Sequence, residues 1–249
     1  MGDSLLAAEL AVEAGKVLLR LRDGAKESGL SGEDLKNAGD KAAQDYLAAA
    51  LGRLCPEDAV LSEEAADSAA RLSNHRVWII DPLDGTREYS EFREDFAVHV
   101  ALWERGTLTA GAVALPAHGT VYSTETHRKM LQTLHGDIRL AVSRSRPSIL
   151  VDQVAKTLGS RLVPMGSAGY KICAVLRGEV DAYLHSGGQY EWDSAAPVAV
   201  ARSYGLHTSR IDGSDLEYNQ LDPYLPDLLV CRKEHAQLIL DTIATKSVA

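Results

Sequence analysis

The sequence predicts an α/β fold in which two lobes pack together. Three observations support this prediction: helical periodicity near the N-terminus, strand-like apolar runs in the middle of the chain, and alternating strands and helices from about residue 138 onward. The 249 residues suit one or two domains of the usual size, roughly 150 residues each. Because the pattern changes near residues 137–142 without a linker, we expect one lobe over residues 1–137 and a second over residues 138–249.

Two helices are expected at the start of the first lobe. Apolar residues recur at helical spacing over residues 4–22, and Gly24 ends this pattern. Residues 26–39 hold three glycines and few large apolar side chains, so we expect a loop there. A second helix over residues 40–54 would then have Asp40 at its N-cap, where a carboxylate accepts hydrogen bonds from backbone amides.

Strands follow in the remainder of the first lobe. One run is continuously apolar, as in buried strands, and two others alternate between apolar and polar residues around a turn at Arg105-Gly106. The expected strands cover residues 60–61, 77–80, 96–102, 108–114 and 121–122. The polar residues 123–136 are expected to form an exposed loop.

The second lobe alternates between the two kinds of element. Its expected strands cover residues 138–142, 161–165, 180–184, 206–209 and 228–231. Its expected helices cover residues 149–158, 168–177, 193–204 and 234–245. Gly178 and Gly205 follow two of these helices, where glycine readily adopts the left-handed conformation that ends a helix.

The net charge of −9 argues against a nucleic-acid partner, because an acidic surface repels a phosphate backbone. Most of this charge is local, since eleven acidic and four basic side chains lie between Glu57 and Asp95. Such an excess indicates either a solvated surface or a cation site.

Cysteine usage and the N-terminus bear on the compartment. Cys55, Cys173 and Cys231 are far apart and odd in number, which indicates free thiols in a reducing compartment. Glu9 and Glu13 interrupt the apolar N-terminal run, so no signal peptide is expected. No apolar stretch approaches the roughly 18 residues of a transmembrane helix. We therefore expect a cytoplasmic protein with no membrane partner.

Candidate metal-binding carboxylates lie at the end of the buried strand over residues 77–80. Asp81 and Asp84 follow this strand with two residues between them, Pro82 restricts the turn, and Gly85 allows a ligand close to the backbone. Carboxylates at this density suit Mg²⁺, which prefers oxygen ligands and binds substrate phosphate. An ordinary turn is the alternative, but the apolar strand and Thr86 after the glycine favour a metal site.

Further acidic residues lie outside this segment. Glu63 and Glu64 directly follow the short strand at residues 60–61. Asp193 opens a helix, where it is either an N-cap or a metal ligand. The small residues Ala195-Ala196 allow that helix to approach a neighbour closely.

These motifs together resemble a known family. The D-P-L-D-G-T segment after an apolar strand, the upstream E-E and the downstream W-D-S-A-A are similar to those of magnesium-dependent, lithium-sensitive phosphatases. That superfamily includes inositol monophosphatases, fructose-1,6-bisphosphatases and 3′(2′),5′-bisphosphate nucleotidases. The segments 187–193 and 219–227 look most like the bisphosphate nucleotidase branch, of the CysQ type found in actinobacteria. The resemblance implies a layered αβαβα fold with the metal site between the lobes.

The resemblance also implies roles for individual residues. Two or three Mg²⁺ ions would be held by the side chains or carbonyls of Glu63, Asp81, Leu83, Asp84 and Asp193. Asp40 and Thr86 would orient and deprotonate the attacking water. The chain departs from the family pattern V-T-x-x-D at Asn37, so Asp40 is either catalytic or only a helix cap.

Substrate contacts are expected in both lobes. Ser167 lies in a run of small residues that opens a helix, where backbone amides suit an anionic group. Arg210 is a candidate for a second phosphate, and Tyr218 and Asn219 are candidates for the adenosine. The expected substrate contacts are Leu83, Asp84, Gly85, Thr86, Ser167, Arg210 and Asn219. The eight histidines lack metal-ligand spacing and are expected to be surface or strand polar residues.

The resemblance therefore implies a Mg²⁺-dependent phosphatase that converts adenosine 3′,5′-bisphosphate to AMP with an activated water, which would link it to sulfate assimilation. Its sulfated precursor, 3′-phosphoadenylyl sulfate, is a second candidate substrate. The alternatives are hydrolysis of inositol 1-phosphate or fructose 1,6-bisphosphate, and a catalytically inactive, metal-dependent nucleotide-binding protein. A haloacid-dehalogenase-type phosphatase fits less well, because its D-x-D-G-T spacing is one residue shorter. The sequence does not give the oligomeric state; a homodimer is a candidate by analogy, because relatives often form dimers.

Overall fold

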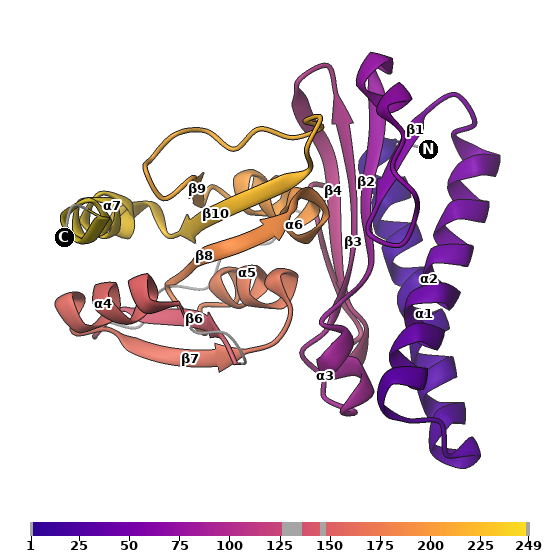
Figure 1. The fold of residues 1–249 in the computed structure, drawn as a ribbon, viewed down its shortest axis with the longest axis horizontal. Helices are drawn as coiled ribbons and strands as arrows, with labels where there is room; N and C mark the ends of the chain where they lie inside the picture. The colour runs from indigo at the N-terminus through magenta and orange to yellow at the C-terminus, as the bar shows by residue number, and fades with distance from the viewer. Residues whose placement is uncertain (1, 126–135, 145–147, 248–249) are drawn as a thin grey trace.

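The computed structural model describes residues 2–125, 136–144 and 148–247. Within these residues the chain forms five layers, and Figure 1 shows them in order from right to left. Helices α1 (Asp3–Ser28) and α2 (Gly32–Leu54) cover one face of the first sheet, and α5 (Ala168–Leu176) and α6 (Glu191–Ser203) lie between the two sheets. Helices α4 (Ile149–Leu158) and α7 (Lys233–Ser247) cover the outer face of the second sheet. The predicted αβαβα layering is confirmed.

The first sheet has the strand order β1-β2-β3-β4-β5. Its strands are β1 (Ala59–Ser62), β2 (Arg76–Asp84), β3 (Ala97–Glu104), β4 (Thr107–Leu115) and β5 (Thr120–Ser123). β1 is parallel to β2, and the other neighbours are antiparallel. β2 is longer than expected, because Asp81 and Asp84 still pair with β3 across an irregularity in the ladder. The two carboxylates are thus anchored in the sheet rather than on a free loop.

The second sheet has the order β7-β6-β8-β10-β9. Its strands are β6 (Arg139–Ser143), β7 (Arg161–Met165), β8 (Ala182–Tyr190), β9 (His207–Ser209) and β10 (Tyr224–Cys231). β8 runs six residues beyond its expected end at Leu184 and leads directly into α6. The irregular pairing of β8 with β10 near Ser186 explains why strand periodicity did not extend that far.

The expected loop over residues 26–39 is wrong. α1 continues to Ser28 and α2 begins at Gly32, so most of the segment is helical. Gly39 does not break the helix; a Cβ atom there would lie 2.7 Å from the ring of Tyr89. The glycine is thus used for close packing on α3 (Thr86–Ser90), and this tertiary contact outweighs its low helix propensity.

The expected N-cap at Asp40 is wrong for the same reason. Ser31 is the N-cap of α2, and Asp40 lies inside that helix. Asp193 is also not a cap residue itself; Tyr190 precedes α6, and Asp193 is its third residue. Asp40 therefore has no capping role, whereas Asp193 completes a capping box by accepting a hydrogen bond from the Tyr190 amide through its Oδ2.

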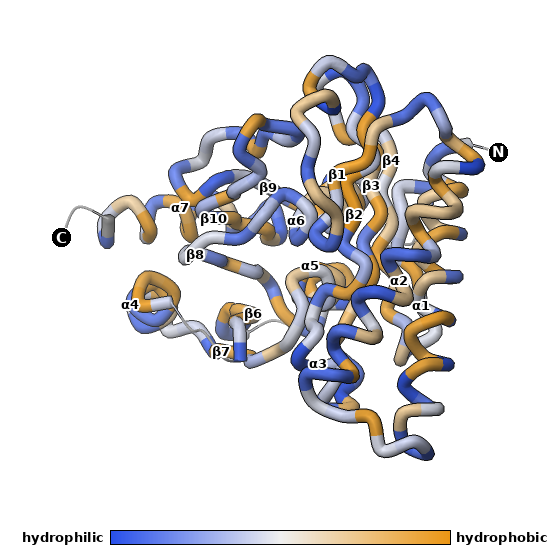
Figure 2. Tube along the Cα trace, turned by 45° about the vertical axis from the view of Figure 1, so that its right-hand side comes forward, coloured by the Kyte–Doolittle hydropathy of each residue, from blue (hydrophilic) through white to orange (hydrophobic). Residues whose placement is uncertain are grey.

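Three apolar clusters hold the layers together. One joins α1 and α2 to the first sheet, a second lies between the two sheets around α5 and α6, and a third joins the second sheet to α4 and α7. Figure 2 shows the apolar residues gathered along the strands of the first sheet. The end of β2 and the starts of α5 and α6 meet in the middle layer.

Two predictions from the sequence are not tested by the described residues. The exposed loop expected over residues 123–136 falls mostly on residues 126–135, which lie outside them. The division into lobes at residue 137 stays a prediction, although the first sheet ends at Ser123 and the second begins at Arg139. Two short 3₁₀ helices, η1 (Ala69–Ser73) and η2 (Pro116–His118), complete the described elements. Among the described helices, none has the length and apolar character required to span a membrane.

Candidate metal centre

Four acidic residues converge between the two sheets. Asp81 and Asp84 lie at the end of β2, and Glu63 directly follows β1. Because β1 and β2 are parallel, with Ser62 opposite Ile80, Glu63 emerges at the same sheet edge as Asp81. Asp193 arrives from the first turn of α6, which packs on β2, β3 and β4.

Neighbouring carboxylates of this cluster raise the pKa values of Glu63, Asp81 and Asp193, as closely spaced buried charges do. Burial, together with the charges of Asp193 and Asp84, raises the pKa of Glu63 to about 8. Burial and the charge of Glu63 raise the pKa of Asp81 well above its usual range. Burial and the charge of Asp84 raise the pKa of Asp193 to about 6. A bound cation would relieve this mutual repulsion.

Asp84 behaves differently from its neighbours. Burial acts to raise its pKa, but His99, Lys171 and a hydrogen bond outweigh burial and lower it. Oδ2 of Asp84 accepts hydrogen bonds from the Ser167 hydroxyl and, at 2.8 Å, from the Gly169 amide. The pKa of Asp84 is therefore lowered, whereas the pKa values of the other three carboxylates are raised.

One oxygen of each aspartate is held by the protein. The Leu83 amide donates to Oδ1 of Asp81 at 3.0 Å, and the Tyr190 amide donates to Oδ2 of Asp193 at 2.6 Å. Oδ2 of Asp81 is buried and accepts no hydrogen bond from the described residues. A buried carboxylate oxygen without a partner is costly. The unpaired oxygen and the all-oxygen donor set fit a hard divalent cation.

The backbone directly after β2 packs closely against neighbouring backbone at Gly85. Gly85 has φ +90°, a left-handed conformation, and a Cβ atom there would lie 3.3 Å from the Phe96 Cα. Thr86 begins α3 directly beside it. Their predicted contact with the scissile phosphate stays a prediction.

Asp40 faces the same centre from α2. Its charge helps to raise the pKa of Glu63. In turn, burial and the charges of Glu64 and Glu33 raise the pKa of Asp40 to about 7. A carboxylate with a pKa near neutrality can accept a proton in catalysis, so the structure is consistent with the catalytic alternative.

The remaining expected substrate residues have protein partners. Arg210 forms a two-point ion pair with Asp227, with both N–O distances 2.7 Å. Asn219 is buried; its side-chain oxygen accepts from Arg71 at 2.6 Å, and its amide donates to Glu191. Their roles in substrate binding stay predictions, and the structure shows that both also stabilise the fold.

Two buried residues beside Asp84, His99 and Lys171, carry no functional motif in the sequence. His99 is fully buried on β3, and its Nε2 atom lies 3.2 Å from Oδ2 of Asp84. Lys171 is buried in α5, where its ammonium donates to the Gly166 carbonyl at 3.2 Å and acts on the charge of Asp84. A single lysine within an apolar helix was a usable signal. His99 had none, because its place opposite Asp81 depends on strand register.

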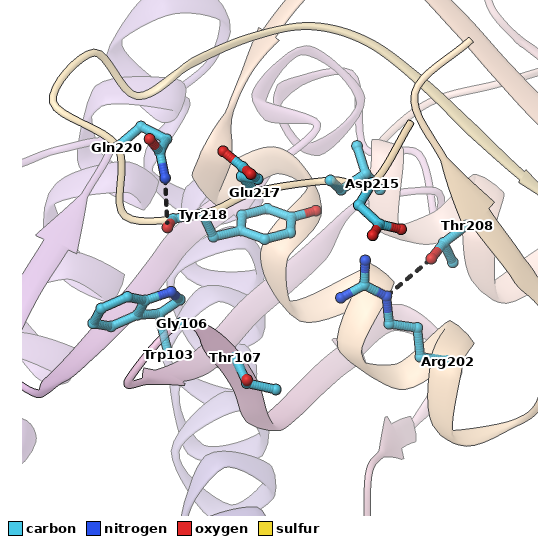
Figure 3. Close-up of a pocket in the computed structure, with 10 residues that line it drawn as sticks. Trp103, Gly106, Thr107, Arg202, Thr208, Asp215, Glu217, Tyr218 and Gln220 are labelled. Atoms are coloured by element: carbon cyan, nitrogen blue, oxygen red, sulfur yellow. Dashed lines mark hydrogen bonds between the residues drawn. The ribbon is translucent and has the colours of Figure 1, made fainter. Parts of the chain in front are cut away.

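A cavity of about 590 Å³ lies elsewhere in the molecule. Figure 3 shows it between the β3–β4 turn, α6 and the loop before β10, with Trp103, Arg202 and Tyr218 in its wall. Trp103 pairs with Val77 near the start of β2. At about 3.3 Å per residue, this end of β2 lies roughly 20 Å from Asp84. The Trp103 end of the cavity is thus far from Asp84. Tyr218 also lines the cavity, and its hydroxyl lies 3.2 Å from that of Ser194, the residue after Asp193, so its expected contact with the adenosine stays a prediction.

Comparison with known proteins agrees with this geometry. The sequence profile of the inositol monophosphatase family matches residues 4–247. A 3′-phosphoadenosine 5′-phosphate phosphatase of Mycobacterium bovis is 52% identical, covering 93% of this chain and 90% of the relative. The 3′(2′),5′-bisphosphate nucleotidase CysQ of Escherichia coli O157:H7 is 30% identical, covering 87% and 94%. The crystal structure of CysQ from Bacteroides thetaiotaomicron matches with a TM-score of 0.79 at 25% identity, covering 93% and 97%. The chain therefore belongs to the inositol monophosphatase family.

Proposed function

We propose that this protein is a Mg²⁺-dependent phosphomonoesterase that removes the 3′-phosphate of adenosine 3′,5′-bisphosphate and leaves AMP. The observation that carries the proposal is the cluster of Glu63, Asp81, Asp84 and Asp193 around an unpaired, buried carboxylate oxygen. The relative from Mycobacterium bovis, 52% identical to this chain, supports the choice of substrate by its name.

The proposed ligands divide between two ion positions. Glu63, Asp81 and the Leu83 carbonyl would hold one Mg²⁺, and Asp81, Asp84 and Asp193 would hold a second. Bound divalent ions supply charge that stabilises the phosphate and lowers the pKa of a water molecule. Because Oδ2 of Asp84 already accepts hydrogen bonds from Ser167 and Gly169, its Oδ1 would be the oxygen offered to an ion.

The protein side chains would complete the reaction. The amides of Gly85 and Thr86 would bind the phosphate, and the Thr86 hydroxyl would orient the attacking water. Asp40, whose pKa is raised to about 7 by burial, would accept the proton of that water. No side chain would become covalently attached to phosphate.

Substrate binding would depend on the metal. Four carboxylates of one cluster repel a phosphate monoester, and two divalent ions would balance their charge. The acidic excess between Glu57 and Asp95 is thus compatible with an anionic substrate only when metal is bound.

Parallel assays of phosphate release test this proposal. Adenosine 3′,5′-bisphosphate, inositol 1-phosphate and fructose 1,6-bisphosphate are compared at equal concentration with Mg²⁺, with and without Li⁺. We expect the highest kcat/KM for the adenosine bisphosphate, inhibition by Li⁺, and loss of activity in Asp84→Asn. Preference for inositol 1-phosphate would contradict the substrate. Absence of Mg²⁺-dependent release from all three would contradict the enzyme and favour a binding protein.

A further inference from the structure

His99 occupies a position that no motif of the chain marks. It lies on β3 directly opposite Asp81 in the strand ladder, and its side chain is 0% exposed. Its Nδ1 atom is 3.2 Å from the Trp192 carbonyl oxygen, and its Nε2 atom is 3.2 Å from Oδ2 of Asp84. Since a carbonyl oxygen only accepts, Nδ1 must carry the hydrogen of that bond. One ring therefore touches the end of β2 and the first turn of α6.

The ring must be considered first as a metal ligand. Ligand atoms of Asp81, Asp84 and His99 lie within 4.8 Å of one another, which is close enough for one ion. Access to Nε2 is restricted, however, because the backbone of α5 lies against it. A Cβ atom on Gly169 would be only 2.0 Å from Nε2. The packing leaves the imidazole enclosed by protein and favours a role in holding the ligands.

The hydrogen bond to Trp192 connects His99 to the helical turn that holds Asp193. Trp192 immediately precedes Asp193, so fixing its carbonyl fixes the first turn of α6. The same ring lies against Asp84, whose Oδ2 also accepts from the α5 amide of Gly169. The imidazole thus spans the two elements that would share the second ion, β2 and α6.

We propose that His99 is a positioning residue that sets the spacing between Asp84 and Asp193, and thereby the affinity of the second ion position. This inference rests on the metal centre of the proposed function and not on its substrate. Residues that orient metal ligands typically change metal affinity by about 10- to 100-fold when they are replaced. The contribution of His99 should therefore be visible in metal binding without any substrate.

Three substitutions separate the two contacts of the ring. His99→Asn keeps a donor near the position of Nδ1 and so the contact with Trp192. His99→Gln places its amide near the position of Nε2 and so keeps the contact with Asp84. His99→Leu keeps bulk and loses both. His75→Asn, at an exposed histidine just before β2, is the matched control.

The experiment measures Mn²⁺ binding to the substrate-free protein by electron paramagnetic resonance, and the shift of Tm that Mg²⁺ produces. We expect about 10- to 100-fold weaker binding of one ion in His99→Leu, smaller losses in His99→Asn and His99→Gln, and no change in His75→Asn. The Tm in EDTA shows whether each variant folds. Activity assays compare each His99 variant with the wild type in two ways. The Mg²⁺ concentration that gives half-maximal activity should change more than the KM for substrate measured at saturating Mg²⁺.

Unchanged Mn²⁺ affinity in a folded His99→Leu protein would overturn the proposal. If His99→Leu fails to fold, unchanged affinity in both His99→Asn and His99→Gln would overturn it equally. Failure of the proposed function can be told apart from failure of this inference. If the proposed function is wrong, the wild type would still bind metal but would release no phosphate. If this inference is wrong, the wild type would still release phosphate, but the His99 variants would bind metal as tightly as the wild type.

Discussion

Ser167 donates a hydrogen bond from its hydroxyl to Oδ2 of Asp84 and so joins the start of α5 to the end of β2. The same hydroxyl oxygen accepts from the Tyr170 amide at 2.9 Å and caps α5. One serine thus links helix initiation in the second half of the chain to a proposed metal ligand in the first.

Replacement of Ser167 by alanine should affect both stability and metal binding. Loss of the cap and of a hydrogen bond to a buried carboxylate should lower the free energy of unfolding by about 1–3 kcal/mol. Asp84 would also lose a partner that orients it, so the half-saturating Mg²⁺ concentration should rise. Urea unfolding and Mg²⁺ titration of activity measure the two effects.

Ser148→Ala is the matched control for that prediction. Ser148 caps α4 by accepting from the Val151 amide, on the outer face of the second sheet. It should lower stability without changing the Mg²⁺ requirement. An equal Mg²⁺ requirement in Ser167→Ala and the wild type would contradict the link to Asp84.

Stability without metal should depend on pH in a defined direction. Burial and neighbouring charges raise the pKa of Glu63 from 4.5 to about 8, so the folded state binds more protons than the unfolded state between these values. Stability should therefore fall as pH rises through this range. Saturating Mg²⁺ should oppose the fall, because the ion favours the charged carboxylates.

Calorimetric Tm measurements from pH 5 to pH 8.5 check this, in EDTA and in Mg²⁺. In EDTA the Tm should drop more steeply for the wild type than for Glu63→Gln, which has no proton to lose at that position. Parallel curves for the two proteins would show that Glu63 does not carry the raised pKa.

Asp40→Asn should separate catalysis from folding. Asp40 lies inside α2 and does not cap it, so the substitution should not lower Tm; because burial raises the pKa of Asp40 to about 7, a neutral side chain there should raise the Tm above that pH. Loss of a general base should lower kcat by about 10²- to 10⁴-fold. Asp45→Asn, at an exposed residue paired with Lys41 in the same helix, is the control and should keep full activity. A wild-type kcat in Asp40→Asn would remove Asp40 from the mechanism.

Arg71 supports the loop that contains Asn219. It is 2% exposed and donates to Asp67, to the Asn219 side chain and to the Gln220 carbonyl. Arg71→Met would leave these partners unpaired, and breaking a buried charge network costs about 3–5 kcal/mol. Urea unfolding should show this loss. Lys16→Ala removes only an exposed pair with Glu13 and should cost less than about 1 kcal/mol.

The close grouping of the proposed metal ligands was predictable from the sequence because its signals are local. Asp81 and Asp84 follow an apolar run that pattern alone identifies as a buried strand, and the glycine beside them has the positive φ that the close approach requires. The layered fold followed from the resemblance of these motifs to a family, and the structure bears it out.

The errors have a different physical origin, in long-range contacts. Gly39 suggested a loop, but it lies in a helix that needs a small residue against Tyr89. His99 looked like one polar strand residue among several, because only the register of β3 places it opposite Asp81. The bond between the Asn219 side chain and Arg71, 148 positions earlier in the chain, was likewise not visible in the sequence, and the expected contact of Asn219 with substrate stays a prediction.

Identification of the product as a function of Mg²⁺ tests the central claim most directly. Adenosine 3′,5′-bisphosphate is incubated with the wild type and with Asp81→Asn, and the nucleotide products are separated by chromatography. We predict that the wild type yields adenosine 5′-monophosphate and phosphate only when Mg²⁺ is present, and that Asp81→Asn yields neither. Equal turnover in EDTA, or release of the 5′-phosphate instead, would contradict the account.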